Sequence, residues 1–189
     1  MSKGRSFRAF SRRYKGLANV LSSEVSISLP FSQGVNQLKS KLINAIWDTG
    51  ATCSAITKKV ANDLGLIPVS KAIVSTANGS IERNVYLVDA LLPNKVNVQG
   101  LRVTECSDLM GGFDILIGMD VISLGDFAIT NNLGSTLMSF RIPSVSSIDF
   151  VKQANAINTK NSSKNKQTPA EIRRKKKKAE RKNKKGKRK

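Results

Sequence analysis

Histidine is absent from this chain of 189 residues. The Ser-His-Asp and Cys-His arrangements both use imidazole as the general base, so the sequence excludes them and leaves carboxylates as the natural acid and base groups. Cysteine is almost as scarce, because the chain has only Cys53 and Cys106 and no C-x-x-C pair. Two such residues build neither a disulfide framework nor a zinc site. We therefore expect reduced thiols, no metal ligands and no cofactor.

Long apolar runs are also missing. No stretch approaches the roughly 18 residues of a membrane span, and charged residues interrupt the N-terminal segment where the apolar core of a secretory signal would lie. We therefore expect a cytoplasmic protein. The first 22 residues contain several arginines and no acid, which is also typical of an organellar transit peptide, so that alternative stays open.

Charge is distributed unevenly along the chain and predicts its domain organisation. Residues 1–22 contain six basic and no acidic residues, residues 23–149 nine and eleven, and residues 150–189 seventeen and two. The middle block is a near-neutral folded domain with an ordinary share of apolar residues. We expect residues 1–22 to form a basic arm and residues 150–189 a disordered Lys/Arg-rich tail, since the tail has too few apolar residues to offset the entropy of ordering.

The middle block has the pattern of a mainly β domain. Alternating or dense apolar residues predict strands near 23–29, 42–47, 96–104, 113–118 and 126–142, and Asn78-Gly79 predicts a hairpin turn within 71–92. Four-residue spacing predicts a short helix within 54–66 that ends at Gly65, and a second is expected within 119–125. Many short strands at close spacing favour a barrel or sandwich with minor helices.

One acid follows a dense apolar run in "INAIWDTGATCSAI", residues 43–56. Two carboxylates that share one proton can activate water and protonate a peptide carbonyl without metal or histidine. The triplet Asp-Thr-Gly occurs once, at Asp48. If Asp48 is half of a dyad, its partner must be Asp48 of a second chain across a two-fold axis. On its own, an acid before Thr-Gly is more typical of a surface turn than of a catalytic site.

The stretch "AIWDTGATCSAI" followed by "FDILIGMDVI" resembles the retropepsins, the retroviral-type aspartic proteases, over roughly residues 23–143. The resemblance implies a single-lobed, closed acid-protease barrel with a flap hairpin and one or two short helices, which forms a C2 homodimer. It also implies an aspartic endopeptidase that cleaves polypeptide substrates.

The family's motif assigns roles to individual residues. Asp48 would hold and activate the water, the Thr49 hydroxyl would bond to the partner loop, and the Gly50 N–H would face a carboxylate. Further residues would contact substrate, as the wall of the site or the flap that closes over it. These are Ala51, Thr52, Ser75, Thr76, Ala77, Asn78, Gly79, Ser80 and Ile81. We interpret Trp47 as a packing residue beside the site and Cys53 as a small buried residue.

Two departures and two alternatives accompany this resemblance. Retroviral enzymes commonly have an acid and an arginine where this chain has Thr52 and Met119, so the strength of the dimer is open, although no orphan charge is buried. The domain could instead be a catalytically silent dimerisation module, since a fold does not prove chemistry. The basic tail is suited to nucleic acid or another polyanion, or it serves only to solubilise the protein.

Overall fold

The computed structural model describes residues 6–30, 40–76, 79–165, 173–174 and 176–177. The chain divides into two compact units, Met1–Ser146 and Ser147–Lys189, which are described separately below. Among the described residues, the strands all lie in the first unit, and the second contains one long helix.

The first unit is mainly β, as the sequence predicts. Its strands are β1 (Arg8–Arg13), β2 (Ser22–Ser28), β3 (Ser40–Trp47), β4 (Ala55–Thr57), β5 (Ser70–Thr76), β6 (Gly79–Leu91), β7 (Asn97–Cys106), β8 (Ile115–Ile117), β9 (Asp126–Asn132) and β10 (Ser135–Ile142). The two short helices are α1 (Lys58–Leu64) and α2 (Met119–Ile122), and a 3-10 turn covers Met110–Gly112. Both helices lie where the sequence predicts them, and Gly65 ends α1 in the left-handed conformation.

Six of the strands close into a barrel. They pair in the order β2-β3-β8-β4-β7-β6, and β6 returns to pair with β2. The seventh strand, β5, pairs with β6 alone as the outer half of a hairpin. Most of the pairs are antiparallel, but β8 runs parallel to β3 and β7 parallel to β4. The predicted closed barrel is therefore confirmed.

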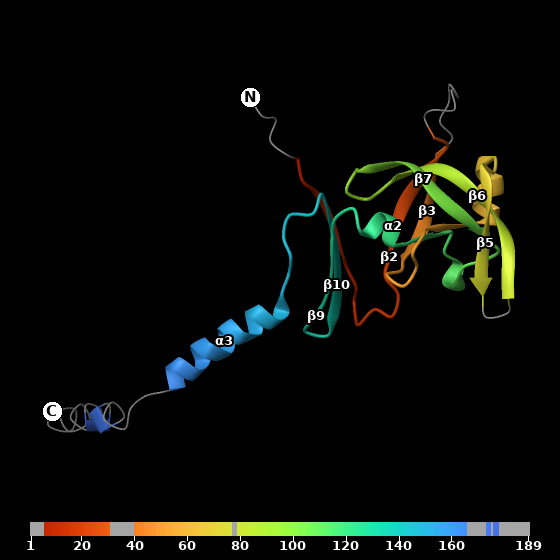
Figure 1. The fold of residues 1–189 in the computed structure, drawn as a ribbon. Coiled ribbons are helices and arrows are strands. Elements are labelled where there is room, and N and C mark those ends of the chain that lie inside the picture. The colour runs from red at the N-terminus through yellow and green to blue at the C-terminus, as the bar shows by residue number, and fades with distance from the viewer. Residues whose placement is uncertain (1–5, 31–39, 77–78, 166–172, 175, 178–189) are drawn as a thin grey trace. The chain divides into compact units, whose positions relative to one another are not determined.

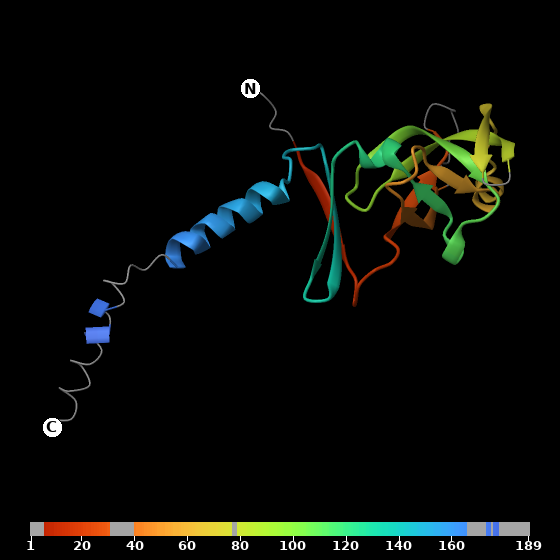
Figure 2. The same cartoon turned by 60° about the horizontal axis from the view of Figure 1, so that its bottom comes forward.

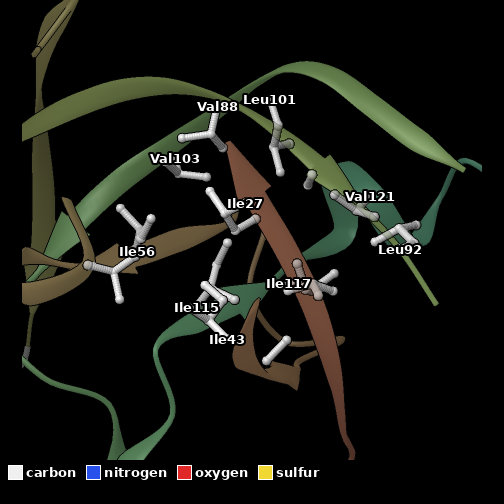
Figure 3. Packing of buried hydrophobic residues seen from close by; sticks show 14 of the residues in the cluster. Ile27, Ile43, Ile56, Val88, Leu92, Leu101, Val103, Ile115, Ile117 and Val121 are labelled. Carbon is white, nitrogen blue, oxygen red and sulfur yellow. The ribbon is translucent and has the colours of Figure 1, made fainter. Parts of the chain in front are cut away.

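The barrel interior is packed with branched aliphatic side chains that alternate along the strands. Figure 3 labels members of this buried cluster, most of them on strands, with Leu92 just after β6 and Val121 in α2: Ile27, Ile43, Ile56, Val88, Leu92, Leu101, Val103, Ile115, Ile117 and Val121. All are at most 7% exposed. Burying a side chain of this size contributes about 1.5–3 kcal/mol to folding, which makes the barrel a rigid support for the loops at its ends.

A second, three-stranded sheet has the order β1-β10-β9. Figures 1 and 2 both show β1 (red) alongside β10. Its inner face contributes Phe10, Phe127 and Phe140 to an aromatic cluster around Trp47 of the barrel strand β3, with ring centroids 5.1–5.7 Å from the indole. Phe140 is fully buried and Trp47 is 3% exposed. Packing among these four rings holds the sheet against the barrel.

Parts of both predicted extensions form regular elements in the structure. Residues 8–13, expected in a basic arm, form β1, because Phe10 reaches the aromatic cluster and pairing with β10 satisfies the backbone. Residues 150–165, expected to be disordered, form helix α3 (Phe150–Asn165), whose described side chains are exposed. Local helix propensity and an N-terminal cap by Asp149, whose carboxylate accepts from the N–H groups of Val151 and Lys152, support this helix. No helix in the described ranges is long and apolar enough to cross a membrane.

We expect Phe140→Ala to lower the free energy of unfolding by about 3–5 kcal/mol, because it leaves a cavity where the second sheet meets the barrel. Urea denaturation followed by tryptophan fluorescence measures this directly, since Trp47 is the chain's single tryptophan. Phe7→Ala is the matched control, because Phe7 is 55% exposed and should change stability by less than about 0.5 kcal/mol. Equal effects of the two substitutions would show that the aromatic cluster does not hold the sheet.

Candidate active site

Asp48 lies where β3 leaves the barrel. Its N–H donates to the carbonyl oxygen of Ile117 (3.0 Å), which continues the parallel pairing of Trp47 with Ile117 by one residue. The backbone of Asp48 is therefore fixed by the sheet, while its side chain is half-buried at the strand end. The barrel presents this carboxylate at its rim with little freedom of position.

The turn after Asp48 bonds to its carboxylate. The Gly50 N–H donates to Asp48 Oδ1 (2.8 Å), and the Ala51 N–H donates to the carbonyl oxygen of Asp48 (3.3 Å). A Cβ atom on Gly50 would lie 3.2 Å from Oδ1, tighter than an ordinary contact, so glycine suits this close approach. Thr49 and Gly50 are both exposed. One carboxylate oxygen is thus held by the chain itself, on a loop whose outer surface is uncovered.

The start of α2 is joined to the same loop through the backbone. The Met119 N–H donates to the carbonyl oxygen of Ala51 (2.8 Å), and the Asp120 N–H donates to that of Thr52 (3.2 Å). A Cβ on Gly118 would lie 2.7 Å from the carbonyl carbon of Cys53, which no side chain tolerates. Gly118 therefore permits the contact, and backbone bonds join the two segments that carry Thr52 and Met119.

A buried serine and a carboxylate complete this link, and neither is predicted from the sequence. Asp120 accepts hydrogen bonds from the N–H of Ser54 (2.8 Å) and from its hydroxyl (2.7 Å). Ser54 Oγ in turn accepts from the N–H of Gly118 (3.1 Å), and Ser54 is fully buried. The sequence shows only that Ser54 follows the loop and that Asp120 comes soon after Gly118. These positions alone do not predict that the two side chains form a hydrogen bond.

The predicted flap hairpin is formed by β5 and β6. Their register pairs Thr76 with Gly79 and Ser75 with Ser80. Ser80 and Ile81 are exposed, Ile81 to 41%, while Ala77 and Asn78 lie outside the described residues. Asp48 is positioned by contacts with β8 and the loop after it. The hairpin of β5 and β6 contributes none of the contacts described above.

Glu105, an acid near the end of β7, is held by hydrogen bonds within the domain. The Tyr86 hydroxyl donates to Glu105, and this bond lowers the pKa of the Glu105 carboxyl. Burial raises the pKa of Tyr86, with the bonded carboxylate acting in the same direction. Glu105 is therefore an ionised, buried acceptor rather than a proton donor. Among the described residues, no cluster of three or more His, Cys, Asp or Glu side chains is suited to a metal ion.

The structure tests two of the side chains that flank Asp48. Trp47 is buried in the aromatic cluster, as interpreted from the sequence. The interpretation of Cys53 as buried is wrong, because Cys53 is exposed. The loop directs the side chain of Ser54 inward to Asp120 and leaves Cys53 outside, and composition alone does not reveal that alternation.

The family model described as "gag-polyprotein putative aspartyl protease" matches residues 36–123, a span that contains both the Asp48 loop and α2. The domain is retropepsin-like. No curated protein matches the sequence. The barrel, the hairpin and the loop of Asp48 form an aspartic protease-like fold.

Solved structures of the same type resemble the chain at a distance. A retropepsin-like aspartic protease from Rickettsia conorii is 14% identical, with a TM-score of 0.45 and coverage of 75% of this chain and 99% of that one. EIAV protease bound to the inhibitor HBY-793 is 18% identical, with a TM-score of 0.42 and coverage of 58% and 90%. The retroviral protease-like domain of Ddi1 from Leishmania major is 16% identical, with a TM-score of 0.35 and coverage of 67% and 95%.

We expect Asp120→Ala to destabilise the retropepsin-like domain by about 2–3 kcal/mol, because it leaves the buried N–H and hydroxyl of Ser54 without their charged acceptor. Chemical denaturation measures the loss, and Asp120→Asn should lose less because it keeps an acceptor oxygen. Glu82→Gln is the control. It removes an exposed ion pair with Lys71 and should change stability by less than about 1 kcal/mol. If Asp120→Ala behaves like this control, the link between Ser54 and Asp120 does not support the loop.

Proposed function

We propose that this chain is an aspartic endopeptidase, active as a homodimer, that hydrolyses peptide bonds by water attack assisted by two Asp48 carboxylates, one from each chain. The observation that carries the proposal is the geometry of Asp48. It is a single Asp-Thr-Gly carboxylate, fixed at the barrel rim, on a loop whose outer residues Thr49 and Gly50 are exposed. An exposed half-site of this kind is suited to pairing with its own copy across a two-fold axis.

The chemistry follows from two carboxylates at short distance. Like charges a few ångströms apart cannot both ionise, so the pair keeps one proton near neutral pH. The ionised member takes a proton from water while the protonated member donates to the substrate's carbonyl oxygen. The Gly50 N–H already holds Asp48 Oδ1, and this bond would help to fix the carboxylate toward the water and the partner carboxylate. We assign Thr49 to the contact between the two loops.

The substrate would be an extended polypeptide segment. Backbone hydrogen bonds to such a segment resemble the addition of a strand, and pockets for alternate side chains give specificity. Ala51 and Thr52 would line the wall beside Asp48, and residues 75–81 of the β5–β6 hairpin would close over the peptide and exclude water. The exposed Ile81 near the hairpin tip supports an apolar contact there.

We expect Asp48→Asn to reduce cleavage of an unfolded protein substrate in mildly acidic buffer by at least about a hundredfold, since an amide cannot exchange the proton. The variant should keep the wild-type unfolding midpoint. Asp108→Asn, an exposed acid in another loop, is the matched control and should cleave at the wild-type rate. Undiminished cleavage by Asp48→Asn would refute the assignment.

Mixing the proteins tests whether two chains share the site. When an equal amount of Asp48→Asn chain is added to a fixed amount of wild type and subunits exchange, about half of the wild-type chains enter mixed dimers and activity should fall to about half. Added Asp108→Asn chain should instead raise total activity. A site that is complete in one chain would be unaffected by the Asp48→Asn chain.

The tail favours a second function. Residues 150–189 contain seventeen basic and two acidic residues, a charge density suited to binding a phosphate backbone through counterion release. No aromatic residue follows Phe150 in this segment, so base stacking is not expected and sequence preference should be weak. If the domain is catalytically silent, it would act as a dimerisation module that presents two such tails.

We expect the full chain to bind a nucleic acid duplex with an affinity that falls about a thousandfold or more between 50 and 200 mM salt, as for proteins that contact six to ten phosphates. A chain that ends at residue 149 should lose this binding and keep any proteolytic activity. Fluorescence anisotropy with a labelled duplex and a salt titration measure the first part. Binding that persists without the tail would place the polyanion site on the domain.

A further inference from the structure

The β5–β6 hairpin leaves the barrel at a defined point. Backbone pairing between β6 and β7 begins with Val85 opposite Thr104 and continues away from the hairpin tip. Residues 79–84 of β6 pair with β5 instead, and β5 pairs with no other strand among the described residues. We call residues 84–86 the root of the hairpin, because the pairing that joins β6 to the barrel starts there.

One buried carboxylate joins β6 to β7 at this root. In the antiparallel register, Glu105 follows Thr104 and lies opposite Asn84, one position beyond the backbone pairing. Glu105 Oε2 accepts hydrogen bonds from the Tyr86 hydroxyl and from Asn84 Nδ2, the second at 3.2 Å. Two side chains of β6 therefore bind the same oxygen atom of β7 where the backbone pairing ends.

These two bonds are shielded from water. Glu105 is 8% exposed and Tyr86 is 4% exposed, and hydrogen bonds to an ionised acceptor are about twice as strong as neutral ones. A further bond at the root, from the Arg102 guanidinium to the Ser70 hydroxyl (3.0 Å), is exposed, where water competes with it. The buried carboxylate is therefore the stronger of the two attachments.

The surroundings of Glu105 keep it ionised in acid. The titratable or charged groups that face it are Lys58 of α1, Arg83 and Tyr86 of β6, and the adjacent Cys106 of β7. The hydrogen bond from Tyr86 lowers the pKa of the Glu105 carboxyl most, and the two cations lower it further, against the opposite effect of burial. A carboxyl with a lowered pKa loses its stabilising contribution only as pH falls through that lowered value. The bonds at the root therefore persist in mildly acidic buffer.

We infer that Glu105 is a positioning residue, which holds the root of the β5–β6 hairpin to the barrel and thereby keeps the hairpin placed over the substrate. The inference rests on the proposed function for what the hairpin covers. Lids turn at a few residues at the ends of elements, and Glu105 binds two residues at such a position. It touches none of the groups that position Asp48, so its effect is on substrate binding rather than on the chemical step.

Hydrogen exchange of a tyrosine variant tests the attachment without any assay of cleavage. Tyr86→Phe removes the donor hydroxyl and keeps the ring. Exchange over residues 70–84 should rise at least about tenfold relative to exchange over strand β3, residues 40–47, because the hairpin opens locally. Tyr14→Phe is the matched control, since Tyr14 is the chain's other tyrosine and its hydroxyl bonds to Ser22 of β2. It should leave the ratio within about twofold. Equal ratios in the two variants would overturn the inference.

Kinetics separate positioning from a general loss of stability. With a peptide substrate, Tyr86→Phe should raise KM at least about fivefold and change kcat less than about twofold, as expected when binding common to substrate and transition state is lost. A merely destabilising substitution lowers the folded fraction, which lowers the apparent kcat and leaves KM unchanged. That pattern in Tyr86→Phe would overturn the positioning role.

Acidification tests the carboxylate itself. In the wild type, exchange over the hairpin, corrected for the intrinsic effect of pH, should accelerate only when pH falls below the usual range of a glutamate. Glu105→Gln has no proton to gain, so its hairpin should exchange faster at every pH and show no such step. A step that remains in Glu105→Gln would overturn the assignment to this residue.

The attachment and the chemistry can fail separately. A wild-type chain that cleaves substrate, and whose hairpin exchange and KM are unaffected by Tyr86→Phe, would refute the role of Glu105 alone. A wild-type chain that never cleaves, but whose hairpin is loosened by Tyr86→Phe and not by Tyr14→Phe, would refute the proposed catalysis and leave the attachment at the root standing.

Discussion

The parallel pairing of β3 with β8 is the constraint on which the candidate site depends. Ala45, Ile46 and Trp47 pair with Ile115, Leu116 and Ile117, so the two strands leave the barrel at the same level and in the same direction. The loop of Asp48 and the start of α2 therefore emerge side by side. The two segments approach so closely that residue 118 must be glycine, because a side chain there would collide with the backbone of Cys53. The carboxylate is held in place by the sheet before any substrate or partner arrives.

Trp47 connects that constraint to the second sheet. The residue before Asp48 packs against three phenylalanines from β1, β9 and β10, and its indole N–H donates to Ser23 of β2 (2.9 Å). The Trp47 side chain thus contacts both the barrel and the second sheet, and its backbone is joined directly to that of Asp48. A shift of the second sheet would move Trp47, because packed interiors transmit strain. Asp48 would move with it, since the two residues are adjacent in the chain.

Local sequence patterns predict most of the barrel and the place of Asp48 at the end of a buried strand. Val25 and Ile27 alternate with serines, and Gly65 follows a four-residue apolar period, so period and turn chemistry are sufficient for these elements. The roles of Asp48, Thr49 and Gly50 come from the resemblance of the motif and stay predictions. Two kinds of feature could not be found this way. β1 depends on one aromatic, Phe10, whose partners on β10 lie more than a hundred residues away, and the bond between Ser54 and Asp120 joins residues 66 apart. Long-range contacts of single residues leave no local period.

On the proposed function, the dimer and the basic tail would act on the same equilibrium. Each chain already fixes its own Asp48 loop, so the remaining cost of assembling a complete site is mainly the loss of translational and rotational freedom on association. Two tails with seventeen basic and two acidic residues each would repel one another in such a dimer, most strongly at low ionic strength. A polyanion would neutralise this repulsion and raise the local concentration of chains at once. On the proposed function, the tail would therefore influence when two half-sites meet, although it contributes no group to the chemistry.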